Sequence, residues 1–342
     1  MIRSKTCLVV GAGASCEIAM PDGREMLGKI AQGLDFARLG SGLQTRDIQL
    51  LAKHFGKAAA RLGKGEEDLH KAGQAIRASA RIGHSIDAIL EQHGHDPVVQ
   101  TAGKIAIAHY TLQAEAQSPL AREPRTPAEL PLRGEENWLF QLGRLVTAGV
   151  PRSKADQCFD KLSIICFNYD RAIQHYLPFI VALAFGMTLD EARQLVDEKL
   201  NIIHPYGKVG RLPWQAGDGP DADWGSEEPA SIHAIAQGLQ TFTQRQENRQ
   251  FLNQMQSIMG SAKRLAFLGF GFDPQNVELL LAHDLNQEPD VFVATTGLSE
   301  PSRAAVRRML RRRAGIEDDG LVSLLDMRAF QFMRDYSLFL ES

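Results

Sequence analysis

The chain has 342 residues, of which 44% are hydrophobic and 23% are charged. These fractions are typical of a globular protein with a sizeable core, and they exclude a disordered or fibrous chain. The net charge of -3 provides no overall positive field, so sequence-independent binding to nucleic acid is not indicated.

The cysteines and the apolar segments point to a cytoplasmic protein outside the membrane. No C-x-x-C pair is present, and four cysteines are too few for a disulfide scaffold in a chain of this length. The apolar residues 7–10 follow Arg3 and Lys5 as in a signal peptide, but the run is shorter than the ~7 residues that such a peptide needs. Residues 176–187 fall short of the ~18 apolar residues of a membrane span.

Short apolar runs alternate with helical patterns along the chain. One helical pattern covers residues 188–200, where Thr188 and Glu191 fit a capping box. The alternation predicts an α/β fold with a Rossmann-like, doubly wound parallel sheet. The expected strands are residues 7–10, 162–167, 201–203, 265–270 and 291–294.

The first two expected strands are about 150 residues apart, far more than a crossover between parallel strands requires. We therefore expect a core of residues 1–30 and 155–342, interrupted by a helical insertion of residues 31–154. Prolines at four positions predict an exposed loop at residues 117–135 within this insertion.

A glycine-rich turn follows the first strand, with the sequence Gly11-Ala12-Gly13-Ala14-Ser15. Backbone amides at such a turn can hold the pyrophosphate of a dinucleotide. Cys16 occupies the place of the third glycine of G-x-G-x-x-G, which weakens a dehydrogenase assignment. A tight turn without a ligand remains an alternative.

Polar clusters follow the expected strands at their carboxyl ends, where open α/β sheets bind ligands. We expect them to converge on one crevice. In chain order they are Met20-Pro21-Asp22-Gly23-Arg24, Phe167-Asn168-Tyr169-Asp170, His204-Pro205-Tyr206-Gly207 and Gly269-Phe270-Gly271-Phe272-Asp273-Pro274.

Together with the glycine turn, this order of motifs resembles the Sir2 (sirtuin) superfamily, and within it the Sir2-like domains of bacterial proteins that hydrolyse NAD in defence against phage. The resemblance covers residues 1–30 and 155–300. It implies that the turn residues hold the pyrophosphate of NAD, that Asn168 and Asp170 contact the nicotinamide ribose and carboxamide, and that His204 acts beside that ribose. It extends NAD binding to Pro21, Asp22, Arg24, Gly269, Gly271 and Thr295.

Ser85-Ile86-Asp87 resembles a short segment of Sir2-like insertions, which implies that Asp87 approaches the nicotinamide end of NAD. Two departures from the sirtuin pattern favour hydrolysis over protein deacylation. No cysteine follows Cys166, so the four-cysteine zinc ribbon of the deacylases is missing, and we expect no metal. Gly23 replaces the phenylalanine that shields the ribose in sirtuins.

Cleavage of the nicotinamide–ribose bond passes through an oxocarbenium-like transition state, and nicotinamide leaves without a proton. Asn168 can orient a water molecule, and Asp170 can stabilise the developing positive charge. His204 can accept a proton at neutral pH. Each also has a structural alternative, because Asn168 and Asp170 can end a strand and cap a helix, and His204 can lie in a surface loop.

The sequence thus predicts an NAD hydrolase that yields nicotinamide and ADP-ribose, with NAD as substrate. We expect a homo-oligomer, and a partner protein or self-assembly as the means of activation. A non-catalytic module that senses NAD or ADP-ribose is an alternative, as is a deacylase or an ADP-ribosyltransferase.

Three other groups of residues receive structural interpretations. A polar face of the insertion is favoured over a metal site for His84, His93 and His95. The arginines between Arg303 and Arg313 are interpreted as a solvated helix face. Trp214 and Trp224 can either anchor packing or gate the site.

Overall fold

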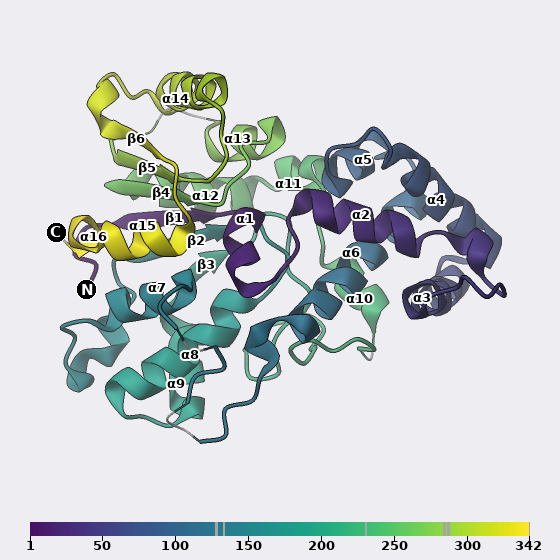
Figure 1. Ribbon diagram of the computed structural model, residues 1–342, viewed down its shortest axis with the longest axis horizontal. Coiled ribbons are helices and arrows are strands. Elements are labelled where there is room, and N and C mark those ends of the chain that lie inside the picture. The colour runs from purple at the N-terminus through teal and green to yellow at the C-terminus, as the bar shows by residue number, and fades with distance from the viewer. Residues whose placement is uncertain (127–128, 133, 230, 283–284, 286–287, 342) are drawn as a thin grey trace.

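The computed structural model describes residues 1–126, 129–132, 134–229, 231–282, 285 and 288–341 (Figure 1). Its six strands form one parallel sheet in the order β3-β2-β1-β4-β5-β6, which is the order of the Rossmann fold. The predicted α/β class with a doubly wound parallel sheet is confirmed. The strands are β1 (Thr6–Val10), β2 (Leu162–Cys166), β3 (Asn201–Ile203), β4 (Arg264–Leu268), β5 (Asp290–Ala294) and β6 (Val322–Leu325).

The first five strands coincide with the apolar runs of the sequence to within a residue or two at each end. Strand β6 was not predicted, because its sequence Val322-Ser323-Leu324-Leu325 lacks the continuous apolar character of a strand buried on both faces. It forms one edge of the sheet, where only Val322 is fully buried.

Helices occupy most of the remaining described chain. The α-helices are α1 (Ala12–Ser15), α2 (Gly23–Gly33), α3 (Arg46–Leu62), α4 (Glu66–Ser79), α5 (Ile86–Gln92), α6 (Pro97–Gln117), α7 (Trp138–Thr147), α8 (Ala172–Phe185), α9 (Leu189–Lys199), α10 (Ile232–Gln237), α11 (Phe242–Glu247), α12 (Arg249–Ser261), α13 (Pro274–Leu280), α14 (Glu300–Ala314), α15 (Ala329–Asp335) and α16 (Ser337–Glu341). The 3-10 turns are η1 (Cys16–Ile18), η2 (Phe36–Arg38), η3 (Pro119–Ala121), η4 (Arg152–Gln157) and η5 (Asp319–Leu321). Helix α9 confirms the predicted helix, with Thr188 as its N-cap and the capping box to Glu191 formed.

Alternate residues of each central strand belong to two different cores. In β1, Leu8 and Val10 pack in a cluster with α7, α8 and α15, whereas Cys7 and Val9 pack in a cluster with α12, α13 and α14. A strand directs successive side chains to opposite faces, so a wholly apolar strand requires helices on both sides. These two helical layers enclose the sheet, as Figure 1 shows.

A third core lies outside the sheet, in what we call the helical region, formed by α2–α6 and α10. Its largest buried side chains include Phe55 of α3 and Tyr110 of α6. Figure 1 shows α2–α5 grouped beyond the end of the sheet where β1 passes into α1. The helical region therefore stands next to the strand ends at which a ligand is expected.

The predicted limits of the insertion fall inside two elements, α2 and η4. Helix α7, from the predicted insertion, packs in the core of the sheet. In the predicted loop at residues 117–135, η3 buries Leu120, and residues 127–128 and 133 lie outside the described residues. The division of the chain into domains stays a prediction.

Among the described residues, no single helix has both the length and the apolar composition to cross a membrane. Helices α8 and α9 meet that test only as a pair, across a bend of 118°.

The direction in which the sheet grows reverses at β1. Strand β1 pairs with β2 on one side and with β4 on the other, and Val10 stands in register with Cys166 and Leu268. Successive strands extend the sheet from β1 to β3, and the chain then returns to place β4 on the opposite side of β1. The loops that leave β1 and β4 therefore diverge at this point, where such folds form a ligand crevice.

Candidate functional site

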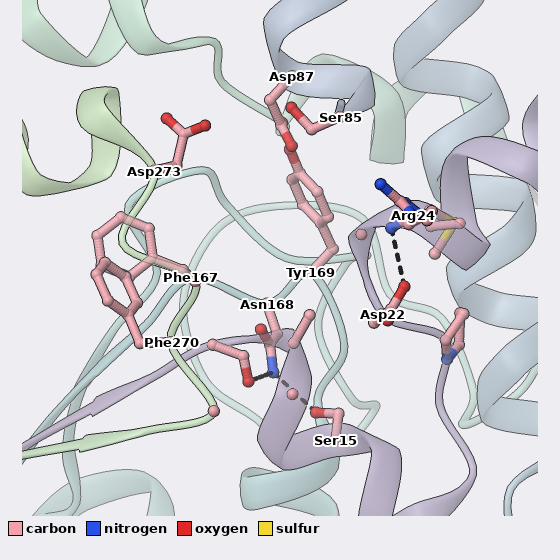
Figure 2. A pocket seen from close by; sticks show the side chains of 18 of the residues that line it. Ser15, Asp22, Arg24, Ser85, Asp87, Phe167, Asn168, Tyr169, Phe270 and Asp273 are labelled. Atoms are coloured by element: carbon pink, nitrogen blue, oxygen red, sulfur yellow. Dashed lines mark hydrogen bonds between the residues drawn. The ribbon is translucent and has the colours of Figure 1, made fainter. Parts of the chain in front are cut away.

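A cavity of about 430 Å³, the sheet-end cavity, lies at the carboxyl ends of β1, β2 and β4 (Figure 2). Its volume is in the range of small-molecule and cofactor sites. The structure brings most of the predicted site residues together here. Those that line the cavity are Gly11, Ala12, Gly13, Ser15, Pro21, Asp22, Arg24, Asp87, Asn168, Asp170, Gly269, Gly271 and Thr295. Ala14 and His204 do not line it.

Close contact between the loops after β1 and β4 accounts for three glycines of the site. A Cβ atom added at Gly11 or Gly13 would lie 2.7 or 2.9 Å from the carbonyl oxygen of Gly269. Gly269 has a φ of +57°, and a Cβ atom there would lie 2.0 Å from the amide nitrogen of Ala14. Each position therefore requires a glycine, whether or not a ligand is bound.

Several amides of the turn already have acceptors. Gly11 donates to the carbonyl of Leu268 and Gly13 to that of Gly269, both at 3.0 Å, and Ala14 donates to the carbonyl of Gly11. Ala12 opens α1, and the first amide of a helix has no acceptor within that helix. Among residues 11–14, the Ala12 amide is thus the backbone donor that is free to bind an anion.

A chain of hydrogen bonds joins the ends of β1 and β2. The side-chain amide of Asn168 donates to the Ser15 hydroxyl at 2.8 Å and to the Gly11 carbonyl at 3.2 Å, and the Ser15 hydroxyl donates to Asp170 at 3.1 Å. All three side chains are buried. Both N–H groups of Asn168 are engaged, so its Oδ1 atom, which has no hydrogen-bond partner among the described residues, is the acceptor left for a ligand or water.

Burial raises the pKa of Asp170 to about 6, and the charge of Glu115 adds to this rise. The Ala172 amide, which donates to Asp170 Oδ1 at 3.0 Å, and the Ser15 hydroxyl oppose it. The Asp170 carboxylate can therefore accept a proton near neutral pH. Its bond to Ala172 also caps the start of α8, so the structural and the functional interpretation of this residue are compatible.

His204 lies behind Asn168 rather than on the cavity. Its Nδ1 atom is 2.9 Å from the backbone oxygen of Asn168, and its Nε2 atom is 2.8 Å from the side-chain nitrogen of Gln174. Burial lowers the pKa of His204 to about 3, so the ring is neutral, with Nδ1 donating and Nε2 accepting. In this arrangement His204 orients the segment that carries Asn168 and does not face the cavity.

The Asp22 carboxylate serves as a helix cap. Its Oδ1 atom accepts from the amides of Arg24 and Glu25 at 2.9 and 2.8 Å, and Glu25 completes a capping box at the start of α2. The Arg24 side chain is exposed on the cavity and makes no hydrogen bond or ion pair with another described residue. Arg24 is therefore the cation that this rim offers to a negatively charged ligand.

Helix α5 brings Asp87 from the helical region to the cavity, opposite the end of β2 (Figure 2). The Tyr169 hydroxyl donates to Asp87, and burial raises the pKa values of both groups. The sequence predicted Asp87 at the nicotinamide end, whereas Tyr169 was named only as part of the cluster at residues 167–170 and was given no role. Tyr169 packs against the core of the helical region and against the core of the sheet, so it joins the two parts across the site.

A fully buried ion pair next to the site was also missed. Arg171, directly after Asp170, binds Glu115 of α6 through two guanidinium nitrogens, and both side chains have no exposed surface. The remaining guanidinium hydrogen bonds go to the backbone oxygens of Arg211, Ala222 and Asp223. No short motif marks a pair 56 residues apart, so only its burial in the structure reveals it.

The other groups noted in the sequence lie away from the cavity or only at its edge. Trp224 stacks on His175 at 4.1 Å and does not line the cavity. His84 lies at the rim, 3.1 Å from Asp273. Among the described residues, no group of three or more His, Cys, Asp or Glu side chains could hold a metal ion. The predicted absence of a metal stays a prediction.

Comparisons with known proteins do not assign the chain to a family. No family model matches it, and no curated protein matches it at a significant level. Among solved structures, a mutant Sir2 homologue in complex with 2'-O-acetyl ADP ribose aligns over 99% of this chain and 92% of that chain, with 12% identity and a TM-score of 0.37.

Proposed function

We propose that the sheet-end cavity binds NAD and that the protein hydrolyses the nicotinamide–ribose bond, giving nicotinamide, ADP-ribose and a proton. The single observation that carries the proposal is the Asn168–Ser15–Asp170 chain at the reversal point of a Rossmann-type sheet, beside a glycine turn. The order of motifs, which resembles that of Sir2 proteins, supports the choice of NAD.

Binding of the diphosphate is assigned to the amide end of α1 and to Arg24. The amide of Ala12 supplies a backbone donor, and Arg24 supplies a positive charge on the same cavity. Gly271 and Thr295 line the part of the cavity beyond β4 and β5, where the adenosine half of NAD is proposed to lie. No side chain fills the space next to the Gly271 Cα atom, which leaves room there.

In the proposed reaction Asn168 orients the attacking water. Its two N–H groups are fixed by Ser15 and Gly11, so its Oδ1 atom can accept a hydrogen bond from water or from a ribose hydroxyl in one defined direction. Water attacks the ribose carbon as the bond to nicotinamide breaks, and the bonding electrons leave with the pyridine nitrogen. Nicotinamide leaves neutral, so the site needs no general acid.

Asp170 has two proposed tasks. Its carboxylate stabilises the positive charge that develops on the ribose, and it accepts the proton that the attacking water loses. A pKa of about 6 suits both tasks, because the group is mostly ionised at pH 7 yet basic enough to take a proton. His204 acts through Asn168 as a positioning residue and transfers no proton.

We expect Asn168→Ala to lower the rate of nicotinamide release from NAD by about 10²-fold or more, because the oriented acceptor is lost. The measurement is chromatographic separation of nicotinamide and ADP-ribose after incubation with NAD, at several protein concentrations. The matched control is Asn253→Ala, an exposed asparagine of α12 away from the cavity, which should leave the rate unchanged. Thermal denaturation of both variants establishes that they are folded.

If the wild type releases no nicotinamide at any concentration, or if Asn168→Ala and Asn253→Ala have equal rates, the hydrolase proposal is wrong. NAD binding that raises the melting temperature without turnover would instead favour the non-catalytic sensing module.

A further inference from the structure

A second cavity, the helical-region cavity, lies among α2, α3, α4 and α6 and has a volume of about 610 Å³. It is separate from the sheet-end cavity, and the two share no lining residue. In Figure 1, α2, α3 and α4 stand beyond the end of the sheet. Nothing in the proposed hydrolysis of NAD uses this cavity.

Positive charge exceeds negative charge around the helical-region cavity. Its acidic lining residues are Asp35 and Asp47, and its cationic lining residues are Lys29, Arg38, Arg77 and Arg81. Asp35 binds both Arg38 and Arg77 through one carboxylate oxygen, at 2.8 and 2.9 Å. One carboxylate thus holds two guanidinium groups in place at the cavity and neutralises only one of their charges.

The side chains of Lys29 and Arg81 have no hydrogen bond or ion pair with another described residue. The second acid is held by other groups: His109, whose Nε2 atom is 3.8 Å from Asp47 Oδ1, is the main cause of the lowered pKa of Asp47, and Gln113 donates to the same oxygen at 2.7 Å. The charge of Lys29 contributes least to this lowering and acts only at a distance. The Arg81 side chain is exposed at the end of the α4 segment. Two guanidinium groups held in place and two free cations around one concave surface match the requirements of a phosphate group.

A hydroxyl group at the cavity has no hydrogen-bond partner among the described residues. Tyr110 is 2% exposed, lines the cavity, and its hydroxyl makes no hydrogen bond with a described residue. A Cβ atom at Gly33 would lie 1.9 Å from this hydroxyl oxygen, so the glycine leaves the hydroxyl room at the cavity wall. The hydroxyl of a tyrosine whose ring is buried usually has a hydrogen-bond partner, and a ligand bound in the cavity would provide one.

We propose that the helical-region cavity is a binding site for a phosphate-bearing small molecule of nucleotide size. Lys29, Arg38, Arg77 and Arg81 contact the phosphate groups, and the Tyr110 hydroxyl bonds to the part of the ligand that enters the cavity. Small residues along the wall, Gly28 and Ala31 of α2 and Ala80 after α4, leave space for a ring system. This site is independent of the proposed hydrolysis of NAD.

The test is titration calorimetry with ATP, pyrophosphate and adenosine, combined with hydrogen exchange to locate the ligand. We expect ATP and pyrophosphate to bind, adenosine to bind at least tenfold more weakly than ATP, and protection to appear at residues 28–38 and 77–81. Lys29→Ala with Arg81→Ala should weaken ATP binding at least tenfold. Lys57→Ala with Lys64→Ala removes the same charge from exposed positions outside both cavities and should leave ATP binding unchanged.

A second variant, Gly28→Leu, fills the cavity without changing charge. An added Cβ atom at Gly28 meets nothing within 4 Å, and Gly28 lies inside α2, where leucine favours the helix. It should weaken ATP binding while the protein stays folded. The proposal is overturned if ATP and pyrophosphate do not bind at millimolar concentration, if protection is confined to residues 11–24, or if the control pair loses as much affinity as Lys29→Ala with Arg81→Ala.

Discussion

At the scale of single residues, the site depends on side chains whose hydrogen-bonding groups are already engaged. Asn168 has both donors engaged, and His204 has both ring nitrogens engaged, one of them by the backbone of Asn168 itself. Such a side chain has one orientation, so the acceptor that it leaves free has a defined direction. Pre-organised acceptors of this kind need no rearrangement when a substrate binds.

The raised pKa of Asp170 predicts how activity depends on pH. The proposed reaction needs the ionised carboxylate, so the rate of nicotinamide release should rise with pH through about 6 and level off above 7. Asp170→Asn should remove most of the activity together with this pH dependence. A rate for the wild type that is constant between pH 5 and 8 would contradict the role of Asp170.

The same pKa has a consequence for stability that does not depend on activity. The pKa of this carboxyl group is 3.8 in the unfolded chain and about 6 in the folded protein, so its ionisation above pH 6 lowers the free energy of unfolding. This loss of stability disappears as the pH falls toward 4, where the group is protonated in the folded protein. Relative to Asp170→Asn, the wild type should gain on the order of 2 kcal/mol between pH 7 and pH 4. Urea denaturation of both proteins at the two pH values measures this difference. An equal change in the free energy of unfolding of both proteins would contradict a raised pKa of Asp170.

At the scale of elements, the start of α8 is fixed by contacts from three parts of the chain. The Arg171–Glu115 pair ties it to α6 and to the backbone at residues 211–223, and Asp170 caps it. Glu115 also accepts from the amide of Gly225 at 3.2 Å. The helical region and the sheet are thus connected at Arg171, directly after the cavity-lining Asp170.

We expect Glu115→Ala to lower the free energy of unfolding by about 3–5 kcal/mol, because it leaves the guanidinium of Arg171 buried without its counter-charge. Thermal or urea denaturation measures the loss. Glu67→Ala is the control, since Glu67 pairs with Lys71 on the exposed surface of α4, where solvent screens the pair and its contribution to stability is small. Equal stabilities of the two variants would mean that the buried pair does not stabilise the fold.

Elements with a strong local pattern could be predicted from the sequence, and contacts between distant segments could not. The apolar run at residues 162–166 and the capping box at Thr188 each define an element without help from the rest of the chain. The glycine turn and the Asn168-Tyr169-Asp170 segment predicted the cavity because parallel strands end at the same edge of a sheet. The Tyr169–Asp87 bond joins residues 82 positions apart, and no local pattern indicates it.

At the scale of the whole molecule, three histidines with lowered pKa values occupy different parts of the structure. Burial lowers the pKa values of His54 and His175 to about 4 and that of His204 to about 3. His54 lies in the core of the helical region, where neither ring nitrogen has a partner among the described residues. His175 lies in α8, and His204 follows β3.

These histidines predict that the protein loses stability in acid. Below the ordinary pKa of 6.5 these histidines bind protons in the unfolded chain but not in the folded protein. Each histidine therefore lowers the free energy of unfolding by about 1.4 kcal/mol per pH unit until its folded pKa is reached. This loss outweighs the opposite contribution of Asp170. The melting temperature should fall steeply between pH 6.5 and 4.5, and the fall should be smaller for His54→Leu. A melting temperature that is constant over this range would contradict the prediction.

The distance along the chain between β1 and its partners has a consequence for how the protein folds. Ser15 and Asp170 are 155 residues apart, and β4 begins at Arg264. Contacts of such high sequence separation require a large loss of chain entropy before they form, which slows folding. At a synthesis rate of roughly 5–20 residues per second, about 8–30 seconds pass between the synthesis of β1 and that of β2. Its five apolar or buried residues are exposed throughout that interval, so the nascent chain is most vulnerable to aggregation at the segment that later forms the centre of the sheet.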